Sequence, residues 1–181
     1  ASPGAFCVGS LLLVPVRVRP WRVASRSPLR QRLGLMRYLR MRFARRGRYT
    51  TIHAWRGYRE ARSTERWEIL YLPVADITEA NPDMVGVFER SWLLDPGLRQ
   101  IAPHLAARAD GLRAMGAFMF KIGVNERSTE FALRTSETRR RLYAAGKYVP
   151  TEWGTITKRP LLGQWARAYR ARFHDALGEA R

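Results

Sequence analysis

Apolar and polar residues alternate along the chain near residue 40, which predicts the start of a β-sheet. Between residues 39 and 43 the apolar side chains alternate with Arg40 and Arg42, so a strand here would carry one apolar and one arginine face. The β-branched and aromatic residues of 49–55 predict a return strand. Residues 67–72 have a similar composition and predict a third strand.

From residue 76 onward, apolar residues spaced three and four positions apart predict helices. One helix is expected over 81–95, between an Asn-Pro-Asp start and an Asp-Pro-Gly end, and another through 105–119. A basic helix is expected over 135–145, because Gly146 follows it in a position typical of a C-cap. The last helix has an apolar stripe made of Leu162, Trp165, Tyr169, Phe173 and Leu177.

These elements predict an α+β fold with a small mixed or antiparallel sheet, packed helices and a C-terminal amphipathic helix. Residues 1–35 contain four prolines, which do not fit a continuous helix or a central strand, so we expect an extended N-terminal arm there. The α+β domain is expected over 36–150, with a helical insertion at about 76–112. Residues 151–181 would form the C-terminal helical extension.

The charge of the chain is large and unevenly distributed. Lys and Arg number 33 against 15 Asp and Glu, a net charge of +18, and only three of the basic residues are lysines. Residues 1–59 contain 14 arginines and no acid, whereas residues 60–110 have a net charge of −4 and residues 111–181 of +8. An apolar fraction of 46% with six tryptophans excludes a simple disordered polybasic tail. The acid-free segment would repel itself, which indicates an anionic partner.

The residue types needed for catalysis and metal binding are few and scattered. His53, His104 and His174 lie far apart in sequence and away from any paired carboxylates, and the chain has one cysteine. No nucleophile elbow, phosphate-binding loop or dinucleotide fingerprint occurs. We therefore expect no enzymatic activity, no cofactor and no metal site. The longest apolar stretch, 11–16, is too short to cross a bilayer, so no transmembrane segment is expected.

The arginine-rich region is the strongest functional signal. The planar guanidinium donates two parallel hydrogen bonds and stays charged, which suits phosphate. In a strand, Arg40 and Arg42 would lie about 7 Å apart, close to the spacing of successive phosphates. A solvated basic face is the simpler alternative, but the absence of acids and the interleaved aromatic residues favour RNA or DNA.

Four segments carry motifs of one protein family, in the family's order. Residues 38–48 read as alternating apolar and basic residues followed by Arg-Gly-Arg. Arg-Glu-Ala-Arg at 59–62, Arg-Trp-Glu-Ile-Leu-Tyr-Leu-Pro at 66–73 and a basic segment ending in Ala-Gly at 138–146 follow. Together they resemble the bacterial-type small-subunit ribosomal protein sixteen family, although residues 52–54 read Ile-His-Ala where the family has Pro-Phe-Tyr.

This resemblance implies a non-catalytic protein that binds small-subunit ribosomal RNA through arginine–phosphate contacts and supports subunit assembly. Residues 1–35 are rich in Arg and Ser and lack acids, as in mitochondrial transit peptides, so we expect a constituent of the mitochondrial small ribosomal subunit in the matrix. Neighbouring ribosomal proteins would contact residues 76–112 and 160–180. By position in the family motifs, the RNA-facing residues would be Arg40, Arg42, Arg45, Arg46, Arg48 and Arg62, with Arg139, Arg140 and Lys147 as a second cluster. The charge argument alone adds Arg17, Arg19, Arg22, Arg26 and Arg30.

A second hypothesis comes from a different class of protein. A basic accessory subunit of a mitochondrial inner-membrane respiratory or ATP synthase complex would share the basic start and the helical extension. Its arginines would then meet anionic lipid headgroups. The apolar stripe of the last helix fits both hypotheses, so the discriminating observation is whether ribosomal RNA or membrane subunits co-purify with the protein.

Overall fold

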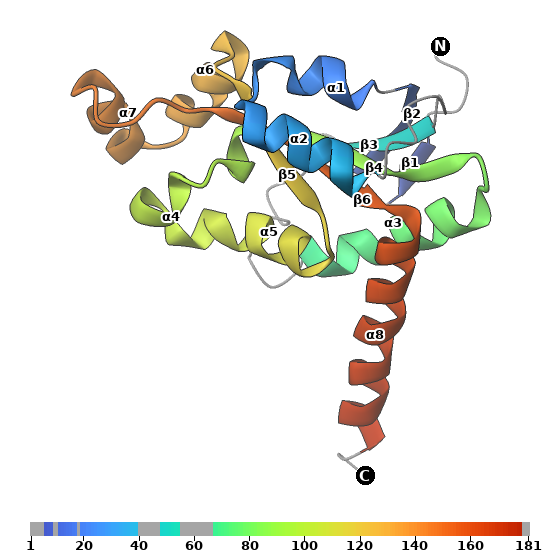
Figure 1. Cartoon of the computed structure of the whole chain (residues 1–181). Helices are drawn as coiled ribbons and strands as arrows, with labels where there is room; N and C mark the ends of the chain where they lie inside the picture. The colour runs from blue at the N-terminus through green and yellow to red at the C-terminus, as the bar shows by residue number, and fades with distance from the viewer. Residues whose placement is uncertain (1–5, 9–10, 18, 40–47, 55–66, 179–181) are drawn as a thin grey trace.

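The computed structural model describes residues 6–8, 11–17, 19–39, 48–54 and 67–178, which form an α+β fold (Figure 1). Its six-stranded mixed sheet has the order β1-β2-β3-β4-β6-β5, with β3 and β4 parallel and the other neighbours antiparallel. The strands are β1 Phe6–Val8, β2 Leu11–Arg17, β3 Arg48–Ala54, β4 Met84–Ser91, β5 Phe118–Gly123 and β6 Glu152–Lys158. The helices are α1 Pro20–Val23, α2 Leu29–Tyr38, α3 Trp67–Ala80, α4 Leu98–Ile101, α5 Pro103–Ala114, α6 Glu126–Arg134, α7 Glu137–Ala144 and α8 Arg159–Gly178. Two 3-10 turns, η1 Ala24–Arg26 and η3 Trp92–Leu94, complete the described elements.

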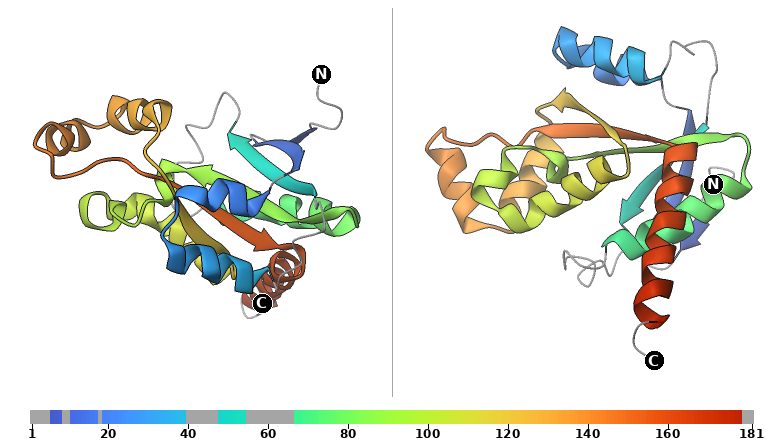
Figure 2. Two further views of the ribbon diagram at one scale, coloured as in Figure 1. Left: turned by 45° about the horizontal axis from the view of Figure 1, so that its top comes forward. Right: turned by 60° about the horizontal axis from the view of Figure 1, so that its bottom comes forward.

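Strand β4 is buried on both faces and separates two hydrophobic cores. Val87 belongs to the core under α3, α5 and α8, and the next residue, Phe88, belongs to the core under α1 and α2. Successive side chains of a strand point to opposite faces, so this pair of residues requires cover on each side. The right-hand view of Figure 2 shows α1 and α2 on one side of the sheet and α3, α5 and α8 on the other.

The first core includes the first turns of the long C-terminal helix. Leu162 and Ala166 of α8 are buried, and the rings of Trp165 and Tyr169 lie 5.3 Å apart. Arg167 and Arg170 of the same helix reach carboxylates of α3, which fixes the two helices to each other. The predicted C-terminal amphipathic helix is therefore confirmed. Beyond these contacts α8 extends away from the sheet toward the C-terminus (Figure 1).

The second core is covered by the N-terminal segment, and the expectation of an extended arm over residues 1–35 is wrong. Within that range the described chain forms two strands and begins α2. The prolines are compatible with this because Pro20 is the first residue of α1 and Pro28 is the N-cap of α2, where no backbone N–H is needed for the helix. The segment formed by α1, η1 and α2 is the N-terminal layer. Ala24 and Leu35 are buried on the side of this layer that faces the sheet.

Polar contacts bind the N-terminal layer to the edge strand β5. The Ser27 hydroxyl donates to the carbonyl oxygen of Lys121, and the Lys121 N–H donates to Gln31 Oε1 at 2.9 Å. At the end of α2, the Tyr38 hydroxyl donates to the carbonyl oxygen of Gly116 at 2.8 Å. Burial raises the pKa of Tyr38 to about 12, so the phenol keeps its donor proton at physiological pH.

Two predicted elements have the opposite secondary structure. The strand predicted over 67–72 is the beginning of α3, since Tyr71, Val74 and Thr78 are buried three and four residues apart. The helix predicted over 81–95 is mostly β4. A strand buried on both faces has a continuous run of apolar residues instead of an alternating pattern. In β4 some of these apolar residues lie three and four positions apart, which is also the spacing of a helix.

Other predictions are confirmed in whole or in part, and the strands β1, β2, β5 and β6 were not predicted. The return strand is β3, and the basic helix is α7, ended by Gly146 at a φ of 66°. The helix predicted through 105–119 is confirmed only as far as Ala114, the end of α5, because Met119 belongs to strand β5. Strand β6 was not predicted, although its Thr-Ile-Thr run is rich in β-branched residues. Residues 40–43 of the first predicted strand lie outside the described residues.

The close approach of β4 and β6 generates the first prediction. A Cβ atom on Gly86 would lie 2.2 Å from the backbone oxygen of Thr157, so Gly86→Ala must displace backbone. We expect the free energy of unfolding to fall by about 1–3 kcal/mol, measured by urea denaturation. In the control Gly97→Ala the nearest atom would lie 3.3 Å away, at a side chain, and a change below about 1 kcal/mol is expected. Equal effects of the two substitutions would contradict this account of the β4–β6 contact.

Candidate nucleic-acid interface

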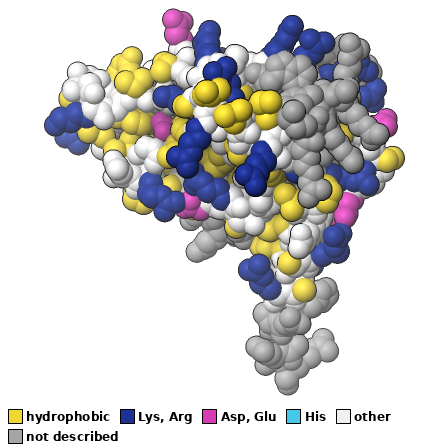
Figure 3. Space-filling model, in the orientation of Figure 1, with side chains coloured by type: hydrophobic (Ala, Val, Ile, Leu, Met, Phe, Trp, Pro, Cys, Tyr) yellow, Lys and Arg dark blue, Asp and Glu magenta, His cyan; other side chains and the backbone are white. Residues whose placement is uncertain are grey.

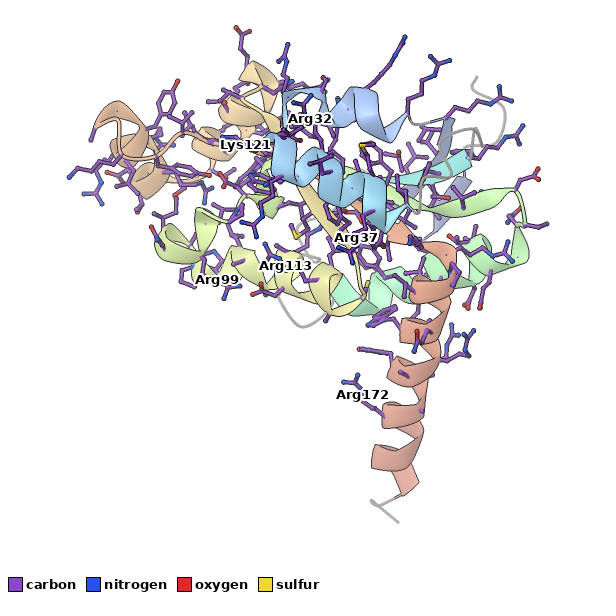
Figure 4. The ribbon with its side chains drawn as sticks, in the orientation of Figure 1. Arg32, Arg37, Arg99, Arg113, Lys121 and Arg172 are labelled. Carbon is purple, nitrogen blue, oxygen red and sulfur yellow. The ribbon has the colours of Figure 1, made fainter. Side chains whose placement is uncertain are left out.

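The outer side of the N-terminal layer and the adjoining strand ends carry exposed arginines. The side chains of eight of them form no ion pair or hydrogen bond with the described residues: Arg17, Arg19, Arg22, Arg26, Arg30, Arg32, Arg37 and Arg48. We call this set the arginine surface. Figure 3 shows dark-blue Lys and Arg side chains spread over the face around α1 and α2, with few acidic ones among them. Arg32 and Arg37 of α2 are labelled in Figure 4, together with Lys121 of β5.

The carboxylates of the described chain neutralise a different group of arginines. All members of the ion pairs among the described residues lie between positions 76 and 170, and none of them belongs to the arginine surface. On α5, for example, Asp110 binds both Arg99 and Arg113. Residues 1–59 contain no acid, so the N-terminal layer has no carboxylate of its own to supply. Among the described residues, the positive charge of the N-terminal layer is therefore not compensated by ion pairs.

The β2–β3 pairing brings two arginines of the arginine surface together. Arg17 and Arg48 are directly opposite each other in the antiparallel register, and both are exposed. Because side chains alternate along a strand, both lie on the sheet face of Leu13 and Ile52, which α3, α5 and α8 cover, and not on the face that α1 and α2 cover. The Cβ atoms of such a pair lie about 5 Å apart, and like charges at this position destabilise a sheet. An anion bound between the two guanidinium groups would remove this repulsion. The fold thus places the two arginines where one phosphate can contact both.

A hollow of about 370 Å³ lies beside the N-terminal layer, between η1, β5 and β6. Arg22, Arg26 and Arg90 contribute three cations to its lining, and Glu152 contributes one carboxylate. The Arg90 Nε atom lies 3.8 Å from Glu152 Oε1, so this acid balances only part of the positive charge. The remaining lining residues are Val23, Ser25, Ile122, Val124 and Asn125.

The second predicted cluster, on α7, divides into exposed and buried residues. Arg139 is 6% exposed, its Nε donates to the carbonyl oxygen of Ala132 at 2.6 Å, and its guanidinium carbon lies 5.0 Å from the centre of the Trp92 ring. The expectation that Arg139 faces RNA is therefore wrong, because its guanidinium is used inside the protein. Arg140 and Lys147 are exposed, and Arg140 also donates to carbonyl oxygens at the end of α6.

The remaining predicted site residues can be placed as follows. Arg17, Arg19, Arg22, Arg26, Arg30 and Arg48 are exposed and belong to the arginine surface. Arg40, Arg42, Arg45, Arg46 and Arg62 lie outside the described residues. Sequence reasoning missed Arg32, Arg37 and Arg90. The spacing of Arg30 and Arg37, seven residues apart, would have indicated two arginines on one helix face had 29–38 been recognised as a helix.

Comparison with protein-family models, with curated proteins and with solved structures finds no significant match to this chain. The assignment of a function therefore depends on the residues and their geometry. Within the described residues, the segment 66–73 that resembles a family strand lies mostly in α3, which is a helix. The arginine surface does not depend on that part of the resemblance.

One cluster of titratable side chains lies inside the molecule. Tyr71 donates to Glu89 Oε1, while Arg108 Nη2 lies 2.7 Å from Glu89 Oε2. Burial, and then the charge of Glu89, raise the pKa of Tyr71 well above its ordinary value, so the phenol remains protonated. The three groups satisfy one another between α3, β4 and α5, which indicates a structural role. The described part of the chain contains no group of three or more His, Cys, Asp or Glu residues placed to hold a metal ion.

The Arg17–Arg48 pair generates a prediction about stability. In Arg48→Glu an attractive cross-strand pair replaces a repulsive one, so we expect the free energy of unfolding to rise by about 0.2–1 kcal/mol at low salt. The control is Arg99→Glu, which places a carboxylate beside Asp110 and should lower stability. Thermal unfolding at low and high salt measures both effects, because salt screens each of them. A loss of stability in Arg48→Glu as large as that in the control would contradict the repulsion.

Proposed function

We propose that this protein binds RNA by its phosphate backbone, through the arginine surface. The observation that carries the proposal is that eight exposed arginines have no carboxylate partner among the described residues, whereas the ion pairs found there join carboxylates to other arginines. Repulsion between exposed like charges that a fold holds close together raises the free energy of the unbound protein. A bound polyanion relieves this repulsion. Arginine also matches phosphate geometry in a bidentate manner, which a diffuse counterion does not.

The more specific proposal is a structural constituent of the small subunit of the mitochondrial ribosome. It rests on the sequence resemblance and on the transit-like composition of residues 1–35. In this setting the arginine surface contacts ribosomal RNA, recognising the backbone and its shape more than the base sequence. The protein-facing regions are 76–112 and 160–180, where many of the arginines are already neutralised by carboxylates.

The salt dependence of binding tests the phosphate contacts. If the eight arginines of the arginine surface each neutralise about one phosphate of a single strand, the logarithm of the association constant should fall with the logarithm of salt concentration with a slope of about −5 to −6. Fluorescence anisotropy with a single-stranded RNA oligonucleotide over a range of salt measures this slope. A slope shallower than about −2 would contradict the proposal, because it would mean that the protein contacts few phosphates.

Two matched double variants test where the RNA binds. Arg22→Gln with Arg26→Gln removes two charges from the arginine surface, and we expect at least tenfold weaker binding and a slope shallower by about 1.5. Arg167→Gln with Arg170→Gln removes the same charge from α8, where both arginines are paired with α3. This control should bind RNA within about threefold of the unaltered protein. Equal losses in the two double variants would reject the location.

Sedimentation distinguishes the ribosomal proposal from the membrane-complex alternative. We expect the protein to sediment with the small ribosomal subunit from mitochondrial extracts and to be released by ribonuclease. Migration with a respiratory or ATP synthase complex, insensitive to ribonuclease, would support the alternative and overturn the ribosomal assignment. Among the described residues, no helix has the length and apolarity that a membrane crossing requires.

A further inference from the structure

We infer that the hollow between η1, β5 and β6 binds one unpaired guanine base of the RNA strand that the arginine surface holds. This inference rests on the proposed RNA binding and adds base recognition to it. Arg22 and Arg26 belong both to the arginine surface and to the lining of the hollow, so a strand bound along the surface passes its opening. The volume, about 370 Å³, is at the lower end of the range for small-molecule pockets.

The carboxylate of Glu152 is the main reason to expect a ligand with N–H donors. The residue is only 6% exposed, although it lines the hollow. Its Oε1 atom accepts a hydrogen bond from the Ser128 hydroxyl at 3.2 Å and lies 3.8 Å from Arg90 Nε. Its Oε2 atom accepts no hydrogen bond from the described residues. A largely buried carboxylate with one unused oxygen is an acceptor that a ligand can satisfy.

Asn125 supplies a donor of the complementary kind in the same hollow. Its side-chain oxygen accepts from the Ser128 N–H at 3.1 Å as the N-cap of α6. The NH₂ group of this amide makes no hydrogen bond with the described residues. The site therefore offers an acceptor at Glu152 and a donor at Asn125, both positioned by contacts with Ser128.

Guanine is the base whose edge matches this pair. Its Watson–Crick edge has two adjacent donors, N1–H and the 2-amino group, next to the O6 acceptor. The unused Oε2 of Glu152 would accept from one donor, Oε1 would accept from the other on the lone pair that Ser128 does not use, and Asn125 would donate to O6. Adenine and cytosine present one amino group beside an acceptor, and uracil presents a single N–H, so each leaves part of the site unsatisfied.

The other lining residues fit a base followed by its phosphate. Val23, Ile122 and Val124 provide apolar surface for the flat faces of the base, and Val124 is 58% exposed in the free protein. Arg22 and Arg26, both exposed, are available to the phosphate of the same nucleotide. Single-stranded RNA is commonly recognised in this way, by splayed bases that are hydrogen-bonded on their edges.

The test compares RNA oligonucleotides that differ at one position. Each is a uridine tract of the same length with a single central guanosine, adenosine, inosine or uridine, and binding is measured by fluorescence anisotropy at one salt concentration. We expect guanosine to bind about tenfold more tightly than adenosine or uridine. Inosine lacks the 2-amino group and should bind more weakly than guanosine. Equal affinity for guanosine and adenosine would overturn the inference.

Variants of the hollow separate this inference from the proposed function. Glu152→Gln should remove the preference for guanosine while keeping the steep salt slope, whereas Glu130→Gln, at an exposed position on α6, should keep both. If Glu152→Gln does not fold, Asn125→Ser tests the same site, because serine retains the helix cap and removes the NH₂ donor. A steep salt slope without base preference in the unaltered protein would leave the proposed function standing and reject the guanine site. A shallow slope for every oligonucleotide would reject the proposed function itself.

Discussion

The burial of β4 on both faces is the constraint on which the rest of the structure depends. Val87 and Phe88 lie in different cores, and Gly86 allows the backbone of β6 to approach where a side chain would not fit. The sheet therefore needs two covering layers. Helices α3, α5 and α8 form one, and the N-terminal segment forms the other. Six of the eight arginines of the arginine surface belong to this second layer, which turns its apolar side inward and its charged side to solvent, whereas Arg17 and Arg48 are at the ends of β2 and β3.

The separation of charges follows from this architecture. The acidic residues of the middle of the chain lie near the arginines of α4, α5 and α8, where exposed pairs each contribute little to stability but cancel charge. The buried Glu89–Arg108 pair is different, since removing one partner would leave an uncompensated charge between α3, β4 and α5. The N-terminal layer has no acid of its own, and its arginines form no ion pair with the described residues. The hollow is lined by Arg22 and Arg26 of the N-terminal layer and also by the Arg90–Glu152 ion pair.

Local patterns succeeded where an apolar stripe or a capping residue marks a helix, and failed where both faces of a strand are apolar or where local propensity and tertiary packing favour different structures. Helix α7 and the stripe of α8 were predicted because they have one apolar face and, for α7, the C-cap Gly146. Strand β4 was predicted as a helix because residues of both its faces are apolar. The start of α3 was predicted as a strand because Trp, Ile and Tyr favour strands locally, while burial of Tyr71 and Val74 against the sheet favours the helix. Arg139 was assigned to the RNA-facing cluster because its burial depends on Trp92, forty-seven residues away in sequence.

The sequence by itself determined the α+β class, the C-terminal helix and the charge asymmetry between an acid-free start and a mixed remainder. These properties are sums over composition or periodicity, so they need no knowledge of distant contacts. Only the tertiary structure decided that residues 11–17 form a strand and 20–38 helical segments, that Arg17 lies opposite Arg48, and that Arg22 and Arg26 share a hollow with Glu152. Those relations join residues far apart in the chain. They are set by strand register and by the packing of helices on a sheet, which no local pattern encodes.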